Sequence, residues 1–471
     1  MNISSTLATR YASNEMCAIW APEAKIILER KLWIAVLKAQ KELGLAIEAK
    51  AISDYEKVIE KVDLSSIDAR EKSLRHDVKA RIEEFNALAG HEIIHSGMTS
   101  RDLTESVEAL QIKTALQLIR DKYVALLAGF ASRAGEFIDQ PIAGRSHNVP
   151  AQVTTVGKRF ATFAEEGLFA FNRLEELLAR LPLRGLKGPV GTAQDALDLF
   201  NGDAHKLAEL DGKVASHLGF ENVLDSVGQI YPRSFDFDVV SALLQLAAAP
   251  SNMATTLRLM AGAELATEGF QKGQVGSSAM PHKMNARSSE RINGFTVLLR
   301  GYCVSLSELA GSQWNEGDVA CSVVRRVALP DSFYTIDGLL ETALTVLAEL
   351  GIFESAITAE LNRNLPFLAT TKILMAAVKK GIGRESAHEV IKEHSLATVV
   401  NIRSGGENDL LARIADDARI PLDLTELNAL IASPLDFTGI ARNQTLQVIA
   451  KVAEVTARYP KASSYQPGAI R

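Results

Sequence analysis

A repeat of large apolar residues between positions 112 and 130 is the feature that most limits how this chain can fold. The residues are spaced alternately by about four and three positions: Ile112, Leu116, Ile119, Tyr123, Leu126 and Phe130. This spacing places an apolar stripe along one side of a helix, as in packed bundles and coiled coils. We therefore predict a long helix here, buried against other helices.

Other segments indicate that helices make up most of the chain. The segments with a similar helical pattern are 23–49, 151–181, 239–270, 287–309 and 331–350. Ala and Leu are frequent, whereas aromatic residues make up only 6%, and this balance favours helix over sheet. We find no alternating pattern that would support a large sheet, so we predict an all-α fold.

The length of 471 residues is enough for about two to three domains. From about Ala359 the helical segments become shorter and are separated by glycines and a proline. We expect an N-terminal helical domain (1–105), a central domain of long helices (106–358) and a C-terminal helical domain (359–471). The last residues, 462–471, are polar and are expected to form a tail.

The net charge of −6 argues against a nucleic-acid-binding surface. The three cysteines, Cys17, Cys303 and Cys321, are widely spaced, and an odd, scattered set fits a reducing compartment such as the cytoplasm. We see neither a secretory signal at the N-terminus nor an apolar run long enough to span a membrane.

The segment 273–285 carries the densest set of chemical groups. Its glycines make the backbone permissive, and Pro281 prevents a regular helix. A serine acts as a base only where cations and N–H groups stabilise its alkoxide. Lys283 and the N–H groups around Ser277 and Ser278 are suited to that task, or to holding a carboxylate. A plain surface loop would explain any single residue, but the whole combination indicates function.

Two further motifs are candidates on physical grounds. His147 lies between glycine and proline in a connection between two helical segments, which is unusual for a core histidine and favours a functional role. Thr99 and Ser100 are N-cap candidates, with Asp102 in the first turn. A helix N-terminus suits a carboxylate or phosphate, although capping alone would also explain these residues.

Arg10-Tyr11 and Arg75-His76-Asp77 are weaker signals when taken alone. The first is explained equally well by an N-terminal arm with one basic residue. The second is explained by a hydrogen-bonded structural pair. Neither would be assigned a function without further information.

Taken together, the motifs resemble the fumarase/aspartase superfamily, whose members release fumarate from succinyl-type substrates. The first basis is Ser277-Ser278-x-Met280-Pro281-x-Lys283-x-Asn285 with Glu290. Motifs from residue 10 to residue 331 are similar to the adenylosuccinate lyase family, in its actinobacterial arrangement. They are Arg10-Tyr11, Arg75-His76-Asp77, Thr99-Ser100-x-Asp102, Gly144-Arg145-Ser146-His147, the Gln229 region, Ser289-Glu290-Arg291 and Ser322-x-x-x-Arg326.

The resemblance implies a role for each matching residue. Ser277 would be the general base and His147 the general acid of an elimination, with Glu290 supporting the histidine. Lys283 and Asn285 would hold the substrate carboxylate. The other substrate-binding residues it implies are Thr99 and Ser100 at the carboxylate, Arg75, His76, Asp77 and His95 at the nucleotide, Gln229 at the polar middle of the substrate, Ser278 and Met280 in the loop, and Arg10, Tyr11, Arg291, Ser322 and Arg326 at the phosphate.

The chain departs from the family pattern at two positions. Ala286 stands where many members carry Pro, and Gly317 stands where many carry Arg, five residues before Ser322. The second change removes a contact to phosphate or carboxylate. We expect either that another arginine, such as Arg325, replaces it or that the substrate contact differs.

The resemblance also implies a homotetramer whose long helices form a shared core and whose active sites take loops from three subunits. The partner would be a small nucleotide substrate, with neither nucleic acid nor membrane, and no cofactor or metal would be needed. The histidines also lack the spacing of metal ligands next to carboxylates.

Two other functions remain open from the sequence. One is a different fumarate-releasing lyase, such as an argininosuccinate lyase, although Arg10, Arg291 and Arg326 favour a phosphorylated substrate. The other is a helical scaffold without activity, which the presence of Ser277 and His147 disfavours.

Overall fold

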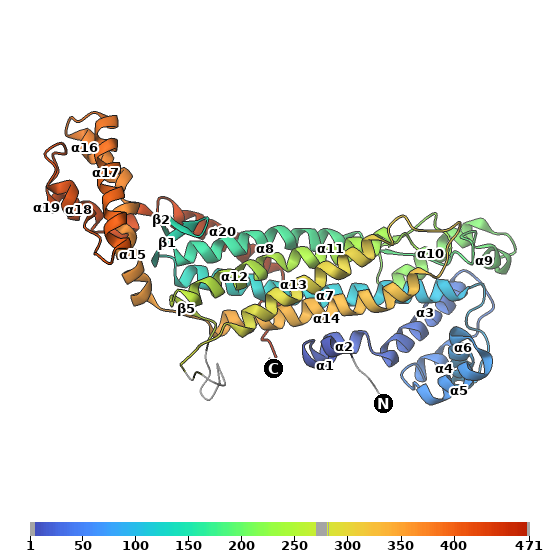
Figure 1. Cartoon of the computed structure of the whole chain (residues 1–471). Coiled ribbons are helices and arrows are strands. Elements are labelled where there is room, and N and C mark those ends of the chain that lie inside the picture. The colour runs from blue at the N-terminus through green and yellow to red at the C-terminus, as the bar shows by residue number, and fades with distance from the viewer. Residues whose placement is uncertain (1–4, 270–279, 281, 469–471) are drawn as a thin grey trace.

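A computed structural model describes residues 5–269, 280 and 282–468 of the chain. The described part is mostly helical and elongated, with a long bundle in the middle and smaller groups of helices at both ends (Figure 1). The long helices of the bundle are α7 (Ser100–Glu136), α8 (Val156–Ala179), α11 (Ser234–Leu246), α12 (Ala248–Gly262), α13 (Arg287–Ser307), α14 (Cys321–Glu349) and α20 (Ala441–Arg458). The predicted all-helical architecture is thus confirmed.

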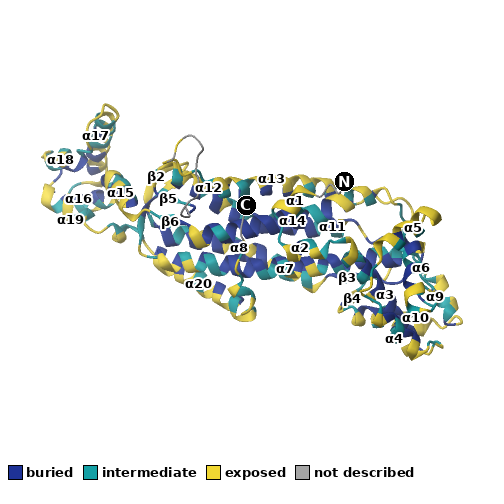
Figure 2. Ribbon diagram, turned by 90° about the horizontal axis from the view of Figure 1, so that it is seen from below, coloured by how far each residue is buried: buried dark blue, intermediate teal, exposed yellow. Residues whose placement is uncertain are grey.

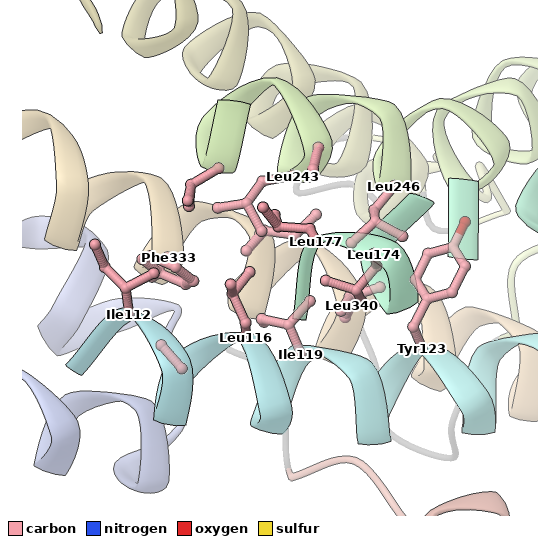
Figure 3. Close-up of a cluster of buried hydrophobic side chains, with 14 of the residues drawn as sticks. Ile112, Leu116, Ile119, Tyr123, Leu174, Leu177, Leu243, Leu246, Phe333 and Leu340 are labelled. Carbon is pink, nitrogen blue, oxygen red and sulfur yellow. The ribbon is translucent and has the colours of Figure 1, made fainter. Parts of the chain in front are cut away.

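The core of the bundle forms around the apolar stripe of α7. The stripe meets side chains of α8, α11 and α14 (Figure 3). The labelled buried residues are Ile112, Leu116, Ile119 and Tyr123 of α7, Leu174 and Leu177 of α8, Leu243 and Leu246 of α11, and Phe333 and Leu340 of α14. Each large apolar side chain buried in this way stabilises the fold by about 1.5–3 kcal/mol. Buried residues follow the middle of the bundle, and exposed ones cover its outside (Figure 2).

Helices of the N-terminal region lie along one side of the bundle and around one of its ends (Figure 1). α1 (Thr6–Arg10) and α2 (Asn14–Ile19) lie along the side, next to α14. The helices at the end are α3 (Pro22–Glu42), α4 (Ala49–Lys57), α5 (Leu64–Leu74) and α6 (Asp77–Ala89), joined there by α9 (Gln194–Leu199) and α10 (Ala204–His217). Within the expected helical segment 23–49, α3 ends at Glu42, just before Gly44, which has a positive φ of 94°.

A second group of helices lies at the opposite end of the molecule (Figure 1). It consists of α15 (Glu354–Leu368), α16 (Thr370–Lys379), α17 (Arg384–Arg403), α18 (Leu410–Ala415) and α19 (Leu424–Ile431). Much of this group has an apolar cluster of its own, which includes Ile373, Val390 and Leu427. The expected boundaries at 105/106 and 358/359 fall within α7 and α15, so the division into domains stays a prediction.

The strands in the described residues form only two-stranded pairs. β1 (Pro141–Ser146) pairs antiparallel with β2 (Val149–Thr155). The other pairs are β3 (Pro182–Leu183) with β4 (Asn222–Val223), which are parallel, and β5 (Ala266–Thr267) with β6 (Gly351–Ile352), which are antiparallel. Residues 151–155 were expected to be helical, but they belong to β2, and α8 starts only after Thr155. The Thr155 hydroxyl accepts from the Lys158 N–H (3.0 Å), which caps the helix.

Two other expectations differ from the structure. Residues 239–270 were predicted as one long helix that Pro250 could kink. The structure instead divides it at Ala247, and Pro250 lies in the first turn of α12, where the missing N–H of proline costs nothing. Residues 462–468 were expected to be a tail, but they include a short 3₁₀ helix, Ala462–Ser464, and pack onto the bundle. None of the described helices is long and apolar enough to cross a membrane.

Candidate active site

The start of α7 is fixed by a buried carboxylate. Thr99 is the N-cap of α7, as predicted, and its N–H donates to Asp102 Oδ2 (2.7 Å). Asp102 Oδ1 accepts from the Gly188 N–H (3.0 Å) and from the buried Arg184. Arg184 also donates to the Gly228 carbonyl (2.8 Å). One buried ion pair therefore aligns the N-terminus of α7 with the loop that carries Gln229.

The loop before α14 packs directly onto the Gln229 loop. The Gln229 N–H donates to the Glu316 carbonyl (2.6 Å). Gly317 has a φ of 139°, and a Cβ at this position would lie 3.2 Å from Gln229 Cβ. The positive φ would strain any other residue at this position, and a Cβ would require Gln229 to shift slightly. Gly317 is therefore adapted to this loop contact, and its backbone could not carry an arginine without changing.

These contacts bring several predicted residues to the same end of the bundle. Arg101 Nη2 donates to Ser322 Oγ (3.2 Å), which joins the start of α7 to the start of α14. Arg326 is exposed and lies one helical turn after Ser322, on the same face. We call the residues Thr99, Ser100, Arg101, Gln229, Ser322 and Arg326 the Thr99 group.

Arg325 does not replace the arginine that is missing at position 317. Its side chain is 3% exposed. Nε donates to Asp236 Oδ2 (2.7 Å) and Nη1 to Glu108 Oε2 (2.6 Å). These acidic partners raise the pKa of Arg325 even though burial lowers it. Arg101 is instead the arginine that reaches Ser322.

The segment with Arg75, His76 and Asp77 links α5 and α6. Arg75 ends α5 in the left-handed conformation, with φ 54°. His76 is the N-cap of α6, and its Nδ1 accepts from the Lys79 N–H (3.3 Å). Asp77 pairs with Arg81 (3.1 Å). The His76 side chain is 53% exposed, so its ring is accessible for a ligand.

His95 is held as a neutral imidazole. Its Nδ1 accepts a hydrogen bond from Trp33 Nε1 (3.1 Å), which requires that nitrogen to be unprotonated. Burial, followed by the charges of His76 and Lys79, lowers the pKa of His95 to about 4. At neutral pH, His95 can therefore offer a substrate polar and aromatic contacts but no positive charge.

Arg10, Tyr11 and Arg291 meet around a cavity of about 440 Å³. The guanidinium carbons of Arg10 and Arg291 lie 5.8 Å and 5.4 Å from the centre of the Tyr11 ring. Burial lowers the pKa of Arg291, and the positive charge of Arg10 acts in the same direction. Two arginines that line one cavity favour the binding of an anion there. We call these three residues the Tyr11 group.

Lys283, Asn285 and Glu290 line a second cavity of about 880 Å³. Arg258 and Glu264 line it as well. Glu290 lines this cavity and the next residue, Arg291, belongs to the Tyr11 group, so the start of α13 lies between the two cavities. Met280 is exposed. The predicted base Ser277 and its neighbour Ser278 lie outside the described residues.

Glu268 holds the N-terminus of α13 next to this cavity. The carboxylate is 8% exposed. It accepts from the N–H groups of Ser288 (2.8 Å) and Ser289 (2.9 Å) and from Ser289 Oγ (3.0 Å). The negative charge also complements the positive end of the helix dipole. Glu268 thereby fixes the direction in which Glu290 and Arg291 point.

His147 is exposed at the turn of the β1–β2 hairpin. His147 and Asn148 both have positive φ, 51° and 61°, as in the two-residue turns that match strand twist. Arg145 Nη1 donates to the Asn148 carbonyl (3.0 Å), and the same guanidinium pairs with Glu360 of α15. The hairpin is thus anchored, and it presents the imidazole away from its own chain.

A single chain does not bring all of these groups together. Gly338 of α14 touches the Tyr11 group, since a Cβ there would lie 3.0 Å from Tyr11 Cβ. Ser322 lies on the same helix sixteen residues earlier, which is about 24 Å at 1.5 Å per residue. The Tyr11 group and the Thr99 group are therefore separate surfaces of one chain.

Three residues with clear roles in this geometry were missed by the sequence reasoning. Arg101 was detectable, because it lies inside the Thr99-Ser100-x-Asp102 motif. Glu268 and Arg184 carry no local sequence signal, since each acts on a segment that is distant in the sequence or on the far side of a loop. Only the folded arrangement identifies them.

The fold and the site point to a helical lyase. A family model described as lyase matches residues 12–301, and one described as adenylosuccinate lyase C-terminus matches residues 366–448. Two solved structures have the same fold. They are a 3-carboxy-cis,cis-muconate lactonizing enzyme from Pseudomonas putida (TM-score 0.81, 18% identity, 96% of this chain and 100% of that one) and a fumarate lyase from Mesorhizobium sp. BNC1 (0.78, 19%, 94% and 98%).

Closer sequence relatives narrow the assignment. The chain is 36% identical to the adenylosuccinate lyase of Saccharomyces cerevisiae over 96% of its length and 94% of the relative. It is 34% identical to the adenylosuccinate lyase of Schizosaccharomyces pombe, over 95% of this chain and 94% of the relative. It is 28% identical to that of Archaeoglobus fulgidus, over 95% of this chain and 98% of the relative. The chain belongs to the adenylosuccinate lyase family. The actinobacterial subtype stays a prediction.

Proposed function

We propose that this protein removes fumarate from adenylosuccinate to give AMP, and from the succinocarboxamide precursor SAICAR to give AICAR. The observation that carries the proposal is the 36% identity to an adenylosuccinate lyase over almost the whole of both chains. The cationic Tyr11 group supports a phosphorylated substrate, in preference to argininosuccinate, which has no phosphate.

The elimination needs a base and an acid within hydrogen-bond reach of the substrate. Ser277 takes a proton from the carbon next to a succinyl carboxylate. As the double bond of fumarate forms, the bond between carbon and nitrogen breaks, and His147 gives a proton to the departing nitrogen. The exposed hairpin turn at His147 supports this assignment, because it leaves the ring accessible to a substrate held elsewhere.

Cations and dipoles stabilise the charge that develops on the carboxylate. Lys283 and Asn285 act from one side, and the N-terminus of α7 at Thr99 and Ser100 acts from another. The Tyr11 group, together with Ser322 and Arg326, binds the phosphate. His76, His95 and Gln229 contact the nucleotide and the middle of the substrate, with Arg75 and Asp77 close to them.

A homotetramer would bring these separate surfaces together. The separation of the Tyr11 and Thr99 groups along α14 supports active sites shared between subunits. Exposed apolar side chains on α13 and α14 support the same assembly: Val297 (60% exposed), Val304 (61%), Val323 (74%) and Val327 (54%). Light scattering should give the mass of four chains, and a monomer would contradict this part of the proposal.

We place the reaction in the cytoplasm, where the free cysteines Cys17, Cys303 and Cys321 would stay reduced. The decisive test mixes the purified protein with adenylosuccinate, without added metal or cofactor, and follows the absorbance. Conversion to the AMP spectrum with release of fumarate supports the proposal. If nothing changes, argininosuccinate and other succinyl adducts are the next substrates to test.

Two substitutions test the assigned roles. Ser277→Ala should abolish turnover while nucleotide binding and the tetramer persist, and unchanged turnover would refute the base. His147→Gln should also remove activity with little effect on binding. If it mainly weakened binding, His76 would become the candidate acid.

A further inference from the structure

The C-terminal segment 459–468 reaches the cavity of the Tyr11 group. It ends next to α1 in two views (Figures 1 and 2), and Tyr465, Gln466 and Gly468 line the cavity together with Arg10 and Arg291. This segment follows α20 and had no function in the sequence analysis. Its position makes it part of the lining of a cavity that also contains two arginines.

The cavity contains a carboxylate that opposes anion binding. Glu341 of α14 lines this cavity together with Arg10 and Arg291 and is buried, whereas Glu15, the other carboxylate of the lining, is exposed to solvent. An uncompensated buried carboxylate in the same cavity would repel a phosphate. Glu341 is therefore compatible with a bound anion only if hydrogen-bond donors and a cation offset its negative charge.

The donors to Glu341 come mostly from the C-terminal segment. Tyr465 OH donates to Glu341 Oε1 (2.5 Å), and the Gly468 N–H donates to Oε2 (2.7 Å). Lys122 Nζ lies 2.7 Å from Oε1. Burial and the Glu341 charge raise the pKa of Tyr465 far above its ordinary value. Its hydroxyl therefore stays protonated and continues to donate.

The same network holds the N-terminal arm in place. Lys122 Nζ contacts Asp337 Oδ1 (2.5 Å) and donates to Ser13 Oγ (3.0 Å). The Ser13 N–H donates to Asp337 Oδ2 (2.6 Å). Ser13 is two residues from Tyr11, so the ion pairs that satisfy Glu341 also fix the segment that carries Arg10 and Tyr11.

We propose that residues 465–468 form a positioning element of this cavity: hydrogen bonds from Tyr465 and Gly468 partly offset the negative charge of Glu341 and thereby allow the Tyr11 group to bind the phosphate of the substrate. This inference rests on the proposed function and adds a role for residues that do not themselves react. Tyr465 is a positioning residue that acts through Glu341. Removing its hydroxyl leaves the carboxylate partly uncompensated and facing the anion.

The test is a double-mutant cycle between Tyr465 and Glu341. Tyr465→Phe should raise KM for adenylosuccinate by roughly fivefold, the effect of about 1 kcal/mol from one lost hydrogen bond, with kcat within about twofold. In the Glu341→Gln background, the same Tyr465→Phe change should raise KM by less than about twofold, because the carboxylate that Tyr465 contacts is no longer there. A purely structural role would not be rescued in this way.

The matched control is Tyr459→Phe. Its hydroxyl donates to Glu175 of α8 (2.5 Å), outside the cavity, so KM should not change. Equal rises in KM with and without Glu341→Gln would overturn the inference, as would an unchanged KM in Tyr465→Phe. If the wild-type protein does not turn over adenylosuccinate, the proposed function fails. Calorimetric AMP affinities of the same variants then test the cavity independently.

Discussion

Two buried ion clusters lie beneath the candidate site, and they are completed in different ways. The first, the Glu105 cluster, consists of Glu105, Glu108, Arg233, Asp236 and Arg325 and lies under the Thr99 group. The second, the Lys122 cluster, consists of Lys122, Asp337 and Glu341 and lies under the Tyr11 group. The first is close to charge balance, because Arg101 also pairs with Glu105 (3.3 Å).

The Lys122 cluster has one cation for two carboxylates, and neutral donors from both ends of the chain supply the rest. These donors are the Ser13 N–H, Tyr465 OH and the Gly468 N–H. The comparison shows that one part of the site is stabilised within the helical bundle, whereas the other depends on the chain termini. It predicts which substitutions are most harmful.

Lys122→Met should have the largest effect, a loss of about 4–5 kcal/mol in the free energy of unfolding. It leaves two buried carboxylates without their cation, and breaking a buried pair is costly. Urea unfolding measures the change. Lys451→Met is the control, because Lys451 pairs with Glu165 on the surface, with both side chains more than half exposed, and should change stability by at most about 1 kcal/mol.

Arg325→Met should cost less, about 3 kcal/mol, the lower end for a broken buried pair. Arg233 still donates to Glu105 (2.8 Å), and Glu108 is 17% exposed, so water can partly replace the lost cation. The same unfolding experiment applies. A loss larger than that of Lys122→Met would contradict the proposed difference between the clusters.

Arg101→Gln should raise KM for adenylosuccinate by about tenfold, with a smaller effect on stability. The expected loss is one charge-assisted hydrogen bond to the substrate, because Arg101 donates to Ser322 within the Thr99 group. Steady-state kinetics of the variant and the wild-type protein measures the change in KM. Arg120→Gln, on the same helix but paired with Asp121 (2.8 Å), should leave KM unchanged; an equal rise there would remove the case for Arg101.

The effect that is smallest at neutral pH, and that grows only below pH 6.5, concerns His95 and separates it from both clusters. Its pKa falls from 6.5 to about 4 on folding, so below pH 6.5 the unfolded chain takes up a proton that the folded chain does not. This contribution to stability is complete above pH 6.5 and is lost as the pH falls toward 4. Urea unfolding at a series of pH values across this window should show that the free energy of unfolding depends less steeply on pH in His95→Gln than in the wild-type protein. An identical slope would mean that His95 titrates normally.

The helices and several motifs of the site were predictable because they follow local rules. The spacing from Ile112 to Phe130 gave α7, and Thr99 with Asp102 gave its first turn. The β1–β2 hairpin was not predictable in the same way. Its turn at His147-Asn148 needs positive φ at both positions, and neither residue is glycine, so the sequence carried no strong turn signal.

Other features depend on contacts between distant segments. The docking of Tyr465 onto Glu341 joins residues 124 positions apart, and a polar segment without an apolar pattern gave no sign of it. The occupied guanidinium of Arg325 likewise depends on Asp236 and Glu108, which lie on other helices. Sequence reasoning therefore found the chemical groups but not the supports that orient them.

The contact between the two chain ends has a consequence for how the protein is made. Ser13 is synthesised long before Gly468, yet Asp337 and Glu341 join them at one cavity. On the ribosome the segment that carries Ser13 therefore remains without part of its anion site until Gly468 has been made. An insertion directly after Gly468 would lie next to this cavity, whereas one in the turn between α18 and α19 would not.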